Sequence, residues 1–170
     1  QQGRSPQAEV LEPGFKYNLP DMNAVLGRSQ FSRLDEFIDK RTKLVARYHE
    51  RLACVPGILP LGDAKATNRH SWHLFIVRVD QDTAGINRTD FMSALKAQNI
   101  GSGVHFRAVH THAWFRDHPD AWRGSNLMNT EWNSDRICSL PLFPAMSESD
   151  VDDVVDAVMH VVPAATEVRT

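Results

Sequence analysis

A histidine and an arginine follow a glycine-rich turn in residues 101–107 (GSGVHFR). Residues two apart on a strand face the same side, so His105 and Arg107 would present an imidazole beside a guanidinium. The planar fork of a guanidinium suits carboxylate and phosphate groups, and an imidazole titrates near neutral pH. The pattern predicts an edge that recognises anions, although satisfied structural groups would give the same pattern.

A lysine lies in a short loop, residues 14–18 (GFKYN), just before a long helical pattern. Lys16 could reach a phosphate as a point charge, and a nearby helix start also favours anions. A solvated surface lysine is the other interpretation.

Other residues that could carry chemistry give weaker signals. His110, His112 and His118 lie close to His105, but their spacing matches no zinc pattern, so we expect no metal. The chain has no nucleophile elbow, phosphate loop or dinucleotide glycine pattern. Three acidic residues near the carboxyl end are better explained as a solvated helix face: Asp152, Asp153 and Asp156.

The composition is that of an ordinary globular protein. The 170 residues are 42% hydrophobic and 24% charged, and the net charge of −2 gives no field that would collect nucleic acid. No segment has the length of apolar chain that a bilayer requires, so we expect no membrane association and a cytoplasmic location. Cys54 and Cys138 are expected to be reduced packing thiols.

The elements that would position these residues begin with a helix. Residues 1–13 are polar and contain two prolines, which is typical of a connector in a longer chain. Apolar residues then recur at three- and four-residue spacing from 21 to 53 without a proline, which predicts one long helix ended by Pro56-Gly57. Such a helix exceeds the width of a small domain and would connect two bodies. We therefore expect a boundary near Ala53, with 1–53 as one part and 54–170 as a compact unit.

The second part predicts an α+β domain with few strands. A central strand covered on both sides is expected over 71–80, a helix over 88–98 and a short strand over 102–107. Short helical turns are expected in 110–129, a short helix in 130–138, an extended run in 140–144 and a last helix over 147–162. Ser147 and Asp150 would cap that last helix, with four valines on its buried face: Val151, Val154, Val155 and Val158.

Four segments carry a resemblance to a known family: GFKYNLPDMNAVLGRSQ, SWHLFIVRVD, IGSGVHFRAVHTHAWFR and NTEWNSDRICSLPLFP. Together they resemble the DegT/DnrJ/EryC1/StrS sugar aminotransferases, and the resemblance runs from Gly14 to about Val162. It implies the carboxy-terminal small α+β domain of a fold type I aminotransferase that depends on pyridoxal 5'-phosphate, preceded by a long inter-domain helix.

The resemblance implies amino transfer from glutamate, the partner of 2-oxoglutarate, to the keto group of a UDP-sugar in a homodimeric enzyme. The segments are most similar to members that act on UDP-4-keto-arabinose in lipid A modification, a pathway of lipopolysaccharide and antibiotic resistance. Another 4-keto or 3-keto sugar nucleotide, or a non-catalytic binding module, is the alternative.

The resemblance also assigns residues. Lys16 matches a loop that reaches the cofactor phosphate of the partner subunit, and His105, Phe106 and Arg107 match the segment that lines the substrate mouth. Tyr17 and His73 are weaker substrate-binding candidates. The family's Schiff-base lysine would lie upstream of Gly14, so this chain alone is expected to have no catalytic residue and no activity.

Overall fold

The chain divides into two compact units, Gln1–Asp35 and Glu36–Thr170. The structure is a computed structural model that describes residues 17–62, 68–104, 107–118, 120 and 126–162. In the first unit, helix α1 (Asp21–Phe31) follows Pro20, whose carbonyl accepts a hydrogen bond of 2.9 Å from the amide of Ala24. None of the residues of α1 is buried.

The single helix expected over 21–53 is wrong, because α1 ends at Phe31 and a second helix, α2, spans Leu34–Leu52. The hydroxyl of Ser32 donates to the carbonyl of Ser29 at 3.2 Å, and the amide of Arg33 bonds to Gln30 at 3.0 Å. Serine side chains that bond to nearby backbone compete with a helix in this way. The boundary expected near Ala53 would separate two bodies of a longer protein, and it stays a prediction. In this chain, α2 supplies residues to the core of the second unit.

The second unit is built on a four-stranded antiparallel sheet in the order β1-β2-β4-β3. The strands are β1 (Ile58–Pro60), β2 (Phe75–Val79), β3 (Gly103–Val104) and β4 (Ile137–Leu140). The sequence predicted β2 as a central strand, which is confirmed, and it predicted a strand at β3. It did not predict β1, and it placed the extended run of β4 three residues too late.

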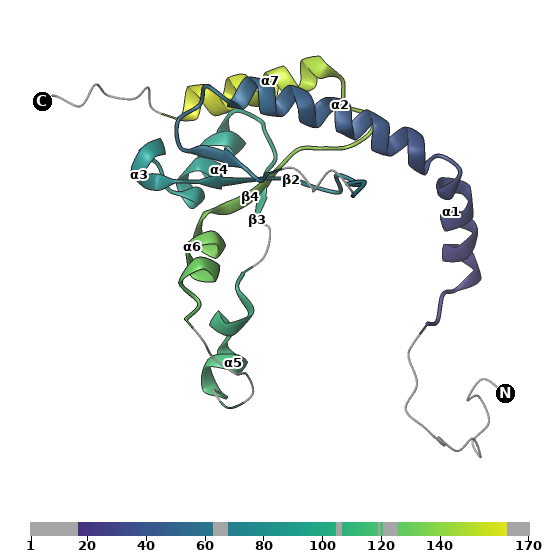
Figure 1. Cartoon of the computed structure of the whole chain (residues 1–170), viewed down its shortest axis with the longest axis horizontal. Coiled ribbons are helices and arrows are strands. Elements are labelled where there is room, and N and C mark those ends of the chain that lie inside the picture. Colours follow the sequence, from purple (N-terminus) through teal and green to yellow (C-terminus); the bar gives the residue numbers. More distant parts are fainter. Residues whose placement is uncertain (1–16, 63–67, 105–106, 119, 121–125, 163–170) are drawn as a thin grey trace, which may run out of the picture. The chain divides into compact units, whose positions relative to one another are not determined.

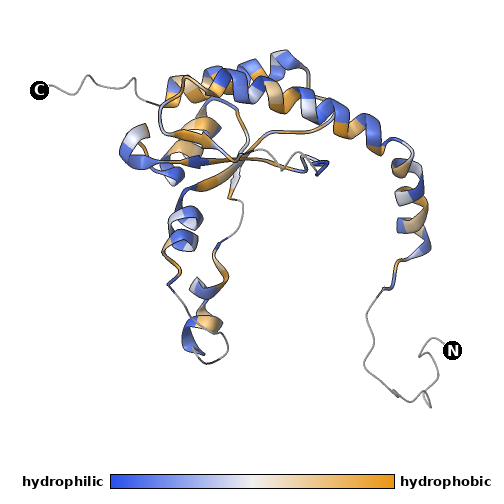
Figure 2. Ribbon diagram, in the orientation of Figure 1, coloured by the Kyte–Doolittle hydropathy of each residue, from blue (hydrophilic) through white to orange (hydrophobic). Residues whose placement is uncertain are grey.

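Helices cover one face of this sheet. Figure 1 shows α2 and α7 (Glu148–Val161) side by side above the strands, with α3 (Gln81–Ala84) and α4 (Arg88–Ala97) close to them. Their apolar sides and the buried strand residues form one core, and Figure 2 shows hydrophobic residues along the strands and hydrophilic residues along much of α6 (Met128–Arg136). At its centre the ring of Tyr48 stacks on Phe75 at 4.4 Å, and its hydroxyl donates to the carbonyl of Pro141 at 2.8 Å.

The other face of the sheet is less covered than expected. Phe75, Val77 and Val79 of β2 are buried, but Ile76 and Arg78 between them are only half-buried. The coverage on that side comes from α6, where the guanidiniums of Arg78 and Arg136 lie 5.8 Å and 4.6 Å from the ring of Trp132. The expected cover on both sides is therefore present, but on the α6 side arginine side chains and one indole provide it, and they leave Ile76 and Arg78 half-buried.

The last helix is confirmed. Ser147 caps α7 by accepting from the amide of Asp150 at 3.2 Å, and the carboxylate of Asp150 accepts from the amide of Ser147 at 2.7 Å. The four predicted valines are its buried residues. Helix α4 and the turns η1 (Val109–Thr111) and α5 (Ala113–Asp117) also agree with the expected helical segments.

The two thiols are both free, but only Cys138 packs in the core. Its burial raises its pKa to about 12. Cys54 is exposed, so the expectation of two packing thiols is wrong for that residue.

Candidate functional site

The described structure contains three of the predicted site residues. Arg107 and His73 lie in the second unit, and Tyr17 lies in the first. Lys16, His105 and Phe106 lie outside the described residues. Within segment 105–107, Arg107 is the residue that the structure describes.

Two bonds to one residue hold the guanidinium of Arg107. Its Nε donates to the hydroxyl of Thr111, and its Nη2 donates to the carbonyl of the same residue, both at 2.8 Å. The hydroxyl of Thr111 donates in turn to the carbonyl of Ala108 at 2.7 Å, across the turn η1. The guanidinium is exposed yet fixed in direction, which reduces the entropy lost when it binds an anion.

Helix α6 bonds to this turn and to the start of α4. The hydroxyl oxygen of Ser134 accepts the amide of Ala108 at 3.0 Å, and the carbonyl of Ser134 accepts from the Nη1 of Arg88. Nearby, the Nε2 of His110 lies 3.1 Å from a carboxylate oxygen of Glu131. Arg107 thus sits on a turn that is tied to α6, and α6 is tied to the start of α4.

Two recesses adjoin Arg107 and Ser134. One, of about 480 Å³, is lined by Arg107, Ala108, Val109, Asn129, Thr130, Asn133, Ser134 and Ile137. The other, of about 280 Å³, is lined by Arg88, Val104, Arg107, Thr111, Ser134 and Asp135. Amides and hydroxyls can bond to sugar hydroxyls, and guanidiniums bind carboxylate or phosphate. The surroundings of Arg107 can therefore bind a polar, anionic small molecule.

The structure does not bring His73 to Arg107. His73 is exposed and precedes β2, whose first residue, Phe75, pairs with Leu140 at the end of β4. Arg107 instead follows β3, whose last residue, Val104, pairs with Cys138 near the start of β4. The register thus places His73 and Arg107 toward opposite ends of the sheet. Tyr17, in the first unit, is 82% exposed.

Asn129, Asn133, Ser134 and Thr111 were not identified as site residues from the sequence. The signal was present in the run NTEWNSDR, which carries two amides and two hydroxyls on one short helix. No local pattern, however, tells that α6 lies against the turn that follows β3.

The described lysines do not fit the anchor that a carbonyl cofactor needs. A lysine that forms a Schiff base is activated by desolvation or by a neighbouring cation. Lys40, Lys43 and Lys96 are all exposed, and Lys40 pairs with Glu36 at 2.7 Å. Within the described residues we therefore find no covalent anchor for pyridoxal phosphate.

No metal site or membrane span is found where the structure is described. Across those ranges, no three His, Cys, Asp or Glu side chains are grouped so that they could hold a metal ion. None of the helices there is both long and apolar enough to cross a bilayer.

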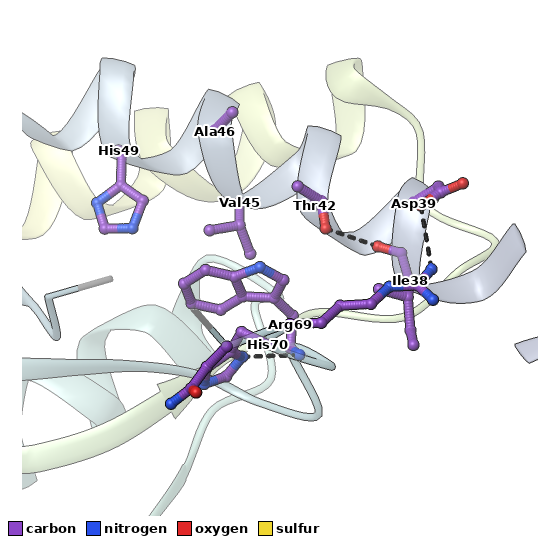
Figure 3. Close-up of a pocket in the computed structure, with 10 residues that line it drawn as sticks. Ile38, Asp39, Thr42, Val45, Ala46, His49, Arg69 and His70 are labelled. Carbon is purple, nitrogen blue, oxygen red and sulfur yellow. Dashed lines mark hydrogen bonds and ion pairs between the residues drawn. The ribbon is translucent and has the colours of Figure 1, made fainter. Parts of the chain in front are cut away.

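A larger recess, of about 580 Å³, lies between α2 and residues 68–72, away from Arg107. Figure 3 shows Val45 and His49 of α2 pointing toward the segment that carries Arg69 and His70. Arg69 pairs with Asp39 at 3.5 Å, and the amide of Trp72 donates to the Nδ1 of His70 at 2.9 Å. Trp72 has a positive φ of 47°, which is rare for a large side chain. None of the residues assigned from the sequence lines this recess.

Comparison with known proteins identifies relatives along nearly the whole chain. The DegT/DnrJ/EryC1/StrS aminotransferase family matches residues 1–159. A protein of Shewanella sediminis (strain HAW-EB3), named UDP-4-amino-4-deoxy-L-arabinose--oxoglutarate aminotransferase, is 49% identical over 164 residues. That match covers 95% of this chain and 42% of the relative, so the chain spans about two fifths of the relative's length.

Solved structures of aminotransferases share the fold of this chain. S. venezuelae DesV, solved in complex with a ketimine intermediate, matches 98% of this chain and 42% of its own, with a TM-score of 0.77 and 27% identity. The PLP form of the putative sugar aminotransferase Spr1654 from Streptococcus pneumoniae matches 93% of this chain and 39% of its own, with a TM-score of 0.73 and 25% identity.

Proposed function

Because the chain belongs to the DegT/DnrJ/EryC1/StrS aminotransferase family, we propose that it is the carboxy-terminal part of a sugar-nucleotide aminotransferase that depends on pyridoxal phosphate. The observation that carries the proposal is the 49% identity to the Shewanella enzyme over 95% of this chain. Residues 54–170 would form the small domain of fold type I, and α2 would lead into it from the large domain.

The name of that relative supplies the reaction we propose for the complete enzyme. It would move an amino group from glutamate to UDP-4-keto-arabinose and release 2-oxoglutarate. We place this reaction in lipid A modification and polymyxin resistance, in the cytoplasm. Pyridoxal phosphate, when bound, would supply the electron sink for the transfer.

In the complete enzyme, this chain would bind the substrate. Arg107, held by Thr111, would bind an anionic group of the substrate, and the amides of Asn129 and Asn133 would face sugar hydroxyls in the adjoining recess. His105 and Phe106 would line the same mouth. Lys16 would reach the cofactor phosphate of the partner in a homodimer. Tyr17 would contribute to substrate binding, and His73 would do so from the end of the sheet opposite Arg107.

The exposed positions of Lys40, Lys43 and Lys96 support the further proposal that this chain is inactive alone. We expect that pyridoxal phosphate added to the 170 residues gives no internal-aldimine absorbance, and that borohydride reduction followed by mass spectrometry finds no specific adduct. A stoichiometric adduct at one lysine would contradict this assignment.

The activity itself is tested on a longer protein that contains this chain. Glutamate and UDP-4-keto-arabinose should give the amino sugar, and Arg107→Gln should raise KM by about tenfold or more, since a charge-assisted contact is lost. Arg116→Gln removes another exposed arginine and is the matched control. Preference for a different keto sugar nucleotide in a substrate panel would replace the arabinose assignment, and binding without turnover would favour a non-catalytic module.

A further inference from the structure

The smaller recess beside Arg107 contains a second guanidinium, that of Arg88. Arg88 is the first residue of α4 and is half-buried. Its Nη1 donates to the carbonyl of Ser134 and, at 3.4 Å, to that of Ile137. These backbone acceptors fix the plane of the guanidinium against the junction of α6 and β4.

Part of this guanidinium lacks an acceptor. The Nε of Arg88 is buried and has no hydrogen-bond partner within the described residues. A guanidinium keeps its charge and cannot give up a proton, so Arg88 stays positive on the lining of the recess. An oxyanion is the acceptor that matches both the charge and the fork geometry.

The other lining groups add one more cation and one more donor. Arg107 has its Nε and Nη2 on Thr111, which leaves its Nη1 available where the structure is described. Ser134 accepts the amide of Ala108 through its hydroxyl oxygen, so its own proton remains to be donated. Thr111 already donates to Ala108 and can act only as an acceptor.

We propose that Arg88, Arg107 and Ser134 form an oxyanion site, and that Asp135 sets its affinity. The two guanidinium charges against the one carboxylate of Asp135 leave one net positive charge on the lining. At about 280 Å³ the recess suits a carboxylate or phosphate end group rather than a whole sugar nucleotide. The identity of the natural ligand rests on the proposed function, whereas binding of a free anion does not.

The site is tested on the 170-residue chain with inorganic phosphate and, separately, glutarate at constant ionic strength. The side-chain Nε–H resonances of Arg88 and Arg107 should shift saturably, while that of the exposed Arg28 should not. Tighter binding of phosphate would identify the diphosphate of a nucleotide as the ligand class, and tighter binding of glutarate would identify the donor carboxylate.

Two substitutions give opposite expectations. Arg88→Gln should weaken anion binding by about tenfold or more, since a charge-assisted bond is lost. Asp135→Asn should strengthen it by about threefold or more, since a like charge is removed at an exposed position. A purely structural role for Arg88 predicts no effect of Asp135→Asn, so this variant decides the matter even if Arg88→Gln does not fold.

The proposal would be overturned if the Nε–H resonances of Arg88 and Arg107 did not shift saturably, or if that of Arg28 shifted equally. An anion affinity that is unchanged in Asp135→Asn would also overturn it. Because these measurements need no cofactor and no turnover, they can fail while the aminotransferase assay succeeds, and the reverse also holds.

Discussion

Single side chains join α2 to α7 through charge. The Nε and Nη2 of Arg47 donate to the two carboxylate oxygens of Asp152 at 2.9 Å and 3.0 Å, and Arg51 pairs with both Asp152 and Asp156. The sequence interpretation of a solvated acidic face is therefore wrong for Asp152, whereas Asp156 is exposed as expected and is also paired with Arg51. Nothing local to the acidic run indicates arginines on a distant helix.

This pair makes stability depend on pH. The hydrogen bonds from Arg47 hold the pKa of Asp152 below its usual value, so the pair stabilises the fold above the unfolded pKa and is lost as pH falls through the folded one. Asp152→Asn should therefore lower the denaturant midpoint at pH 7, and the gap to the wild type should close below about pH 4. Urea titrations across pH measure this.

Asp153→Asn is the matched control, because Asp153 is exposed on the same helix and has no ion pair in the described part of the chain. An equal loss in both variants, or a gap that does not change with pH, would contradict the assigned role of Asp152.

Elements differ in how far the sequence predicts them. Helix α7 was predicted with its cap and buried face, because its signals are local. The break between α1 and α2 was not predicted, although the serines that cause it are visible in the sequence. Strand β1 could not be predicted, since its three residues become a strand only by pairing with β2.

The turn from α2 into β1 depends on Gly57. Its φ is +74°, and a Cβ at this position would lie 2.3 Å from the backbone nitrogen of Ala84. Gly57→Ala should thus lower the free energy of unfolding by about 2 kcal/mol or more, since neither the backbone nor the neighbour can accept the methyl group. Thermal or urea unfolding measures the loss.

Gly62→Ala serves as the comparison, because nothing lies within 4 Å of its added Cβ. Its stability should stay within about 0.5 kcal/mol of the wild type. Similar midpoints for the two alanine variants would show that the turn is less constrained than its geometry indicates.

For the whole molecule, the sequence predicted a mixed helix and sheet domain and singled out Arg107. It could not predict that Arg88 and Ser134 lie beside Arg107, because the contacts join α4, α6 and the turn after β3. Long-range contacts of this kind leave no periodic signal. The same limit explains why His73 was grouped with a residue at the other end of the sheet.

The first unit gives a prediction for the protein in solution. Its apolar side chains are largely exposed, including Met22 at 78%, Val25 at 67% and Phe31 at 75%. Exposed surfaces of this kind favour association, so we expect the chain to self-associate. Light scattering should show an apparent mass that rises with concentration.

Replacing Met22, Val25 and Phe31 with polar residues should reduce that association without unfolding the second unit, whose core they do not join. A monodisperse monomer at high concentration in the unmodified chain would contradict the prediction.

The position of β4 governs the order in which the fold can form. The strand comes late in the chain, yet it pairs with both β2 and β3, which have no ladder with each other. A ribosome must therefore release the chain as far as Leu140 before those two earlier strands acquire a common neighbour. Until then β2 exposes an unpaired inner edge, and a nascent chain in that state is open to chaperones and to mispairing.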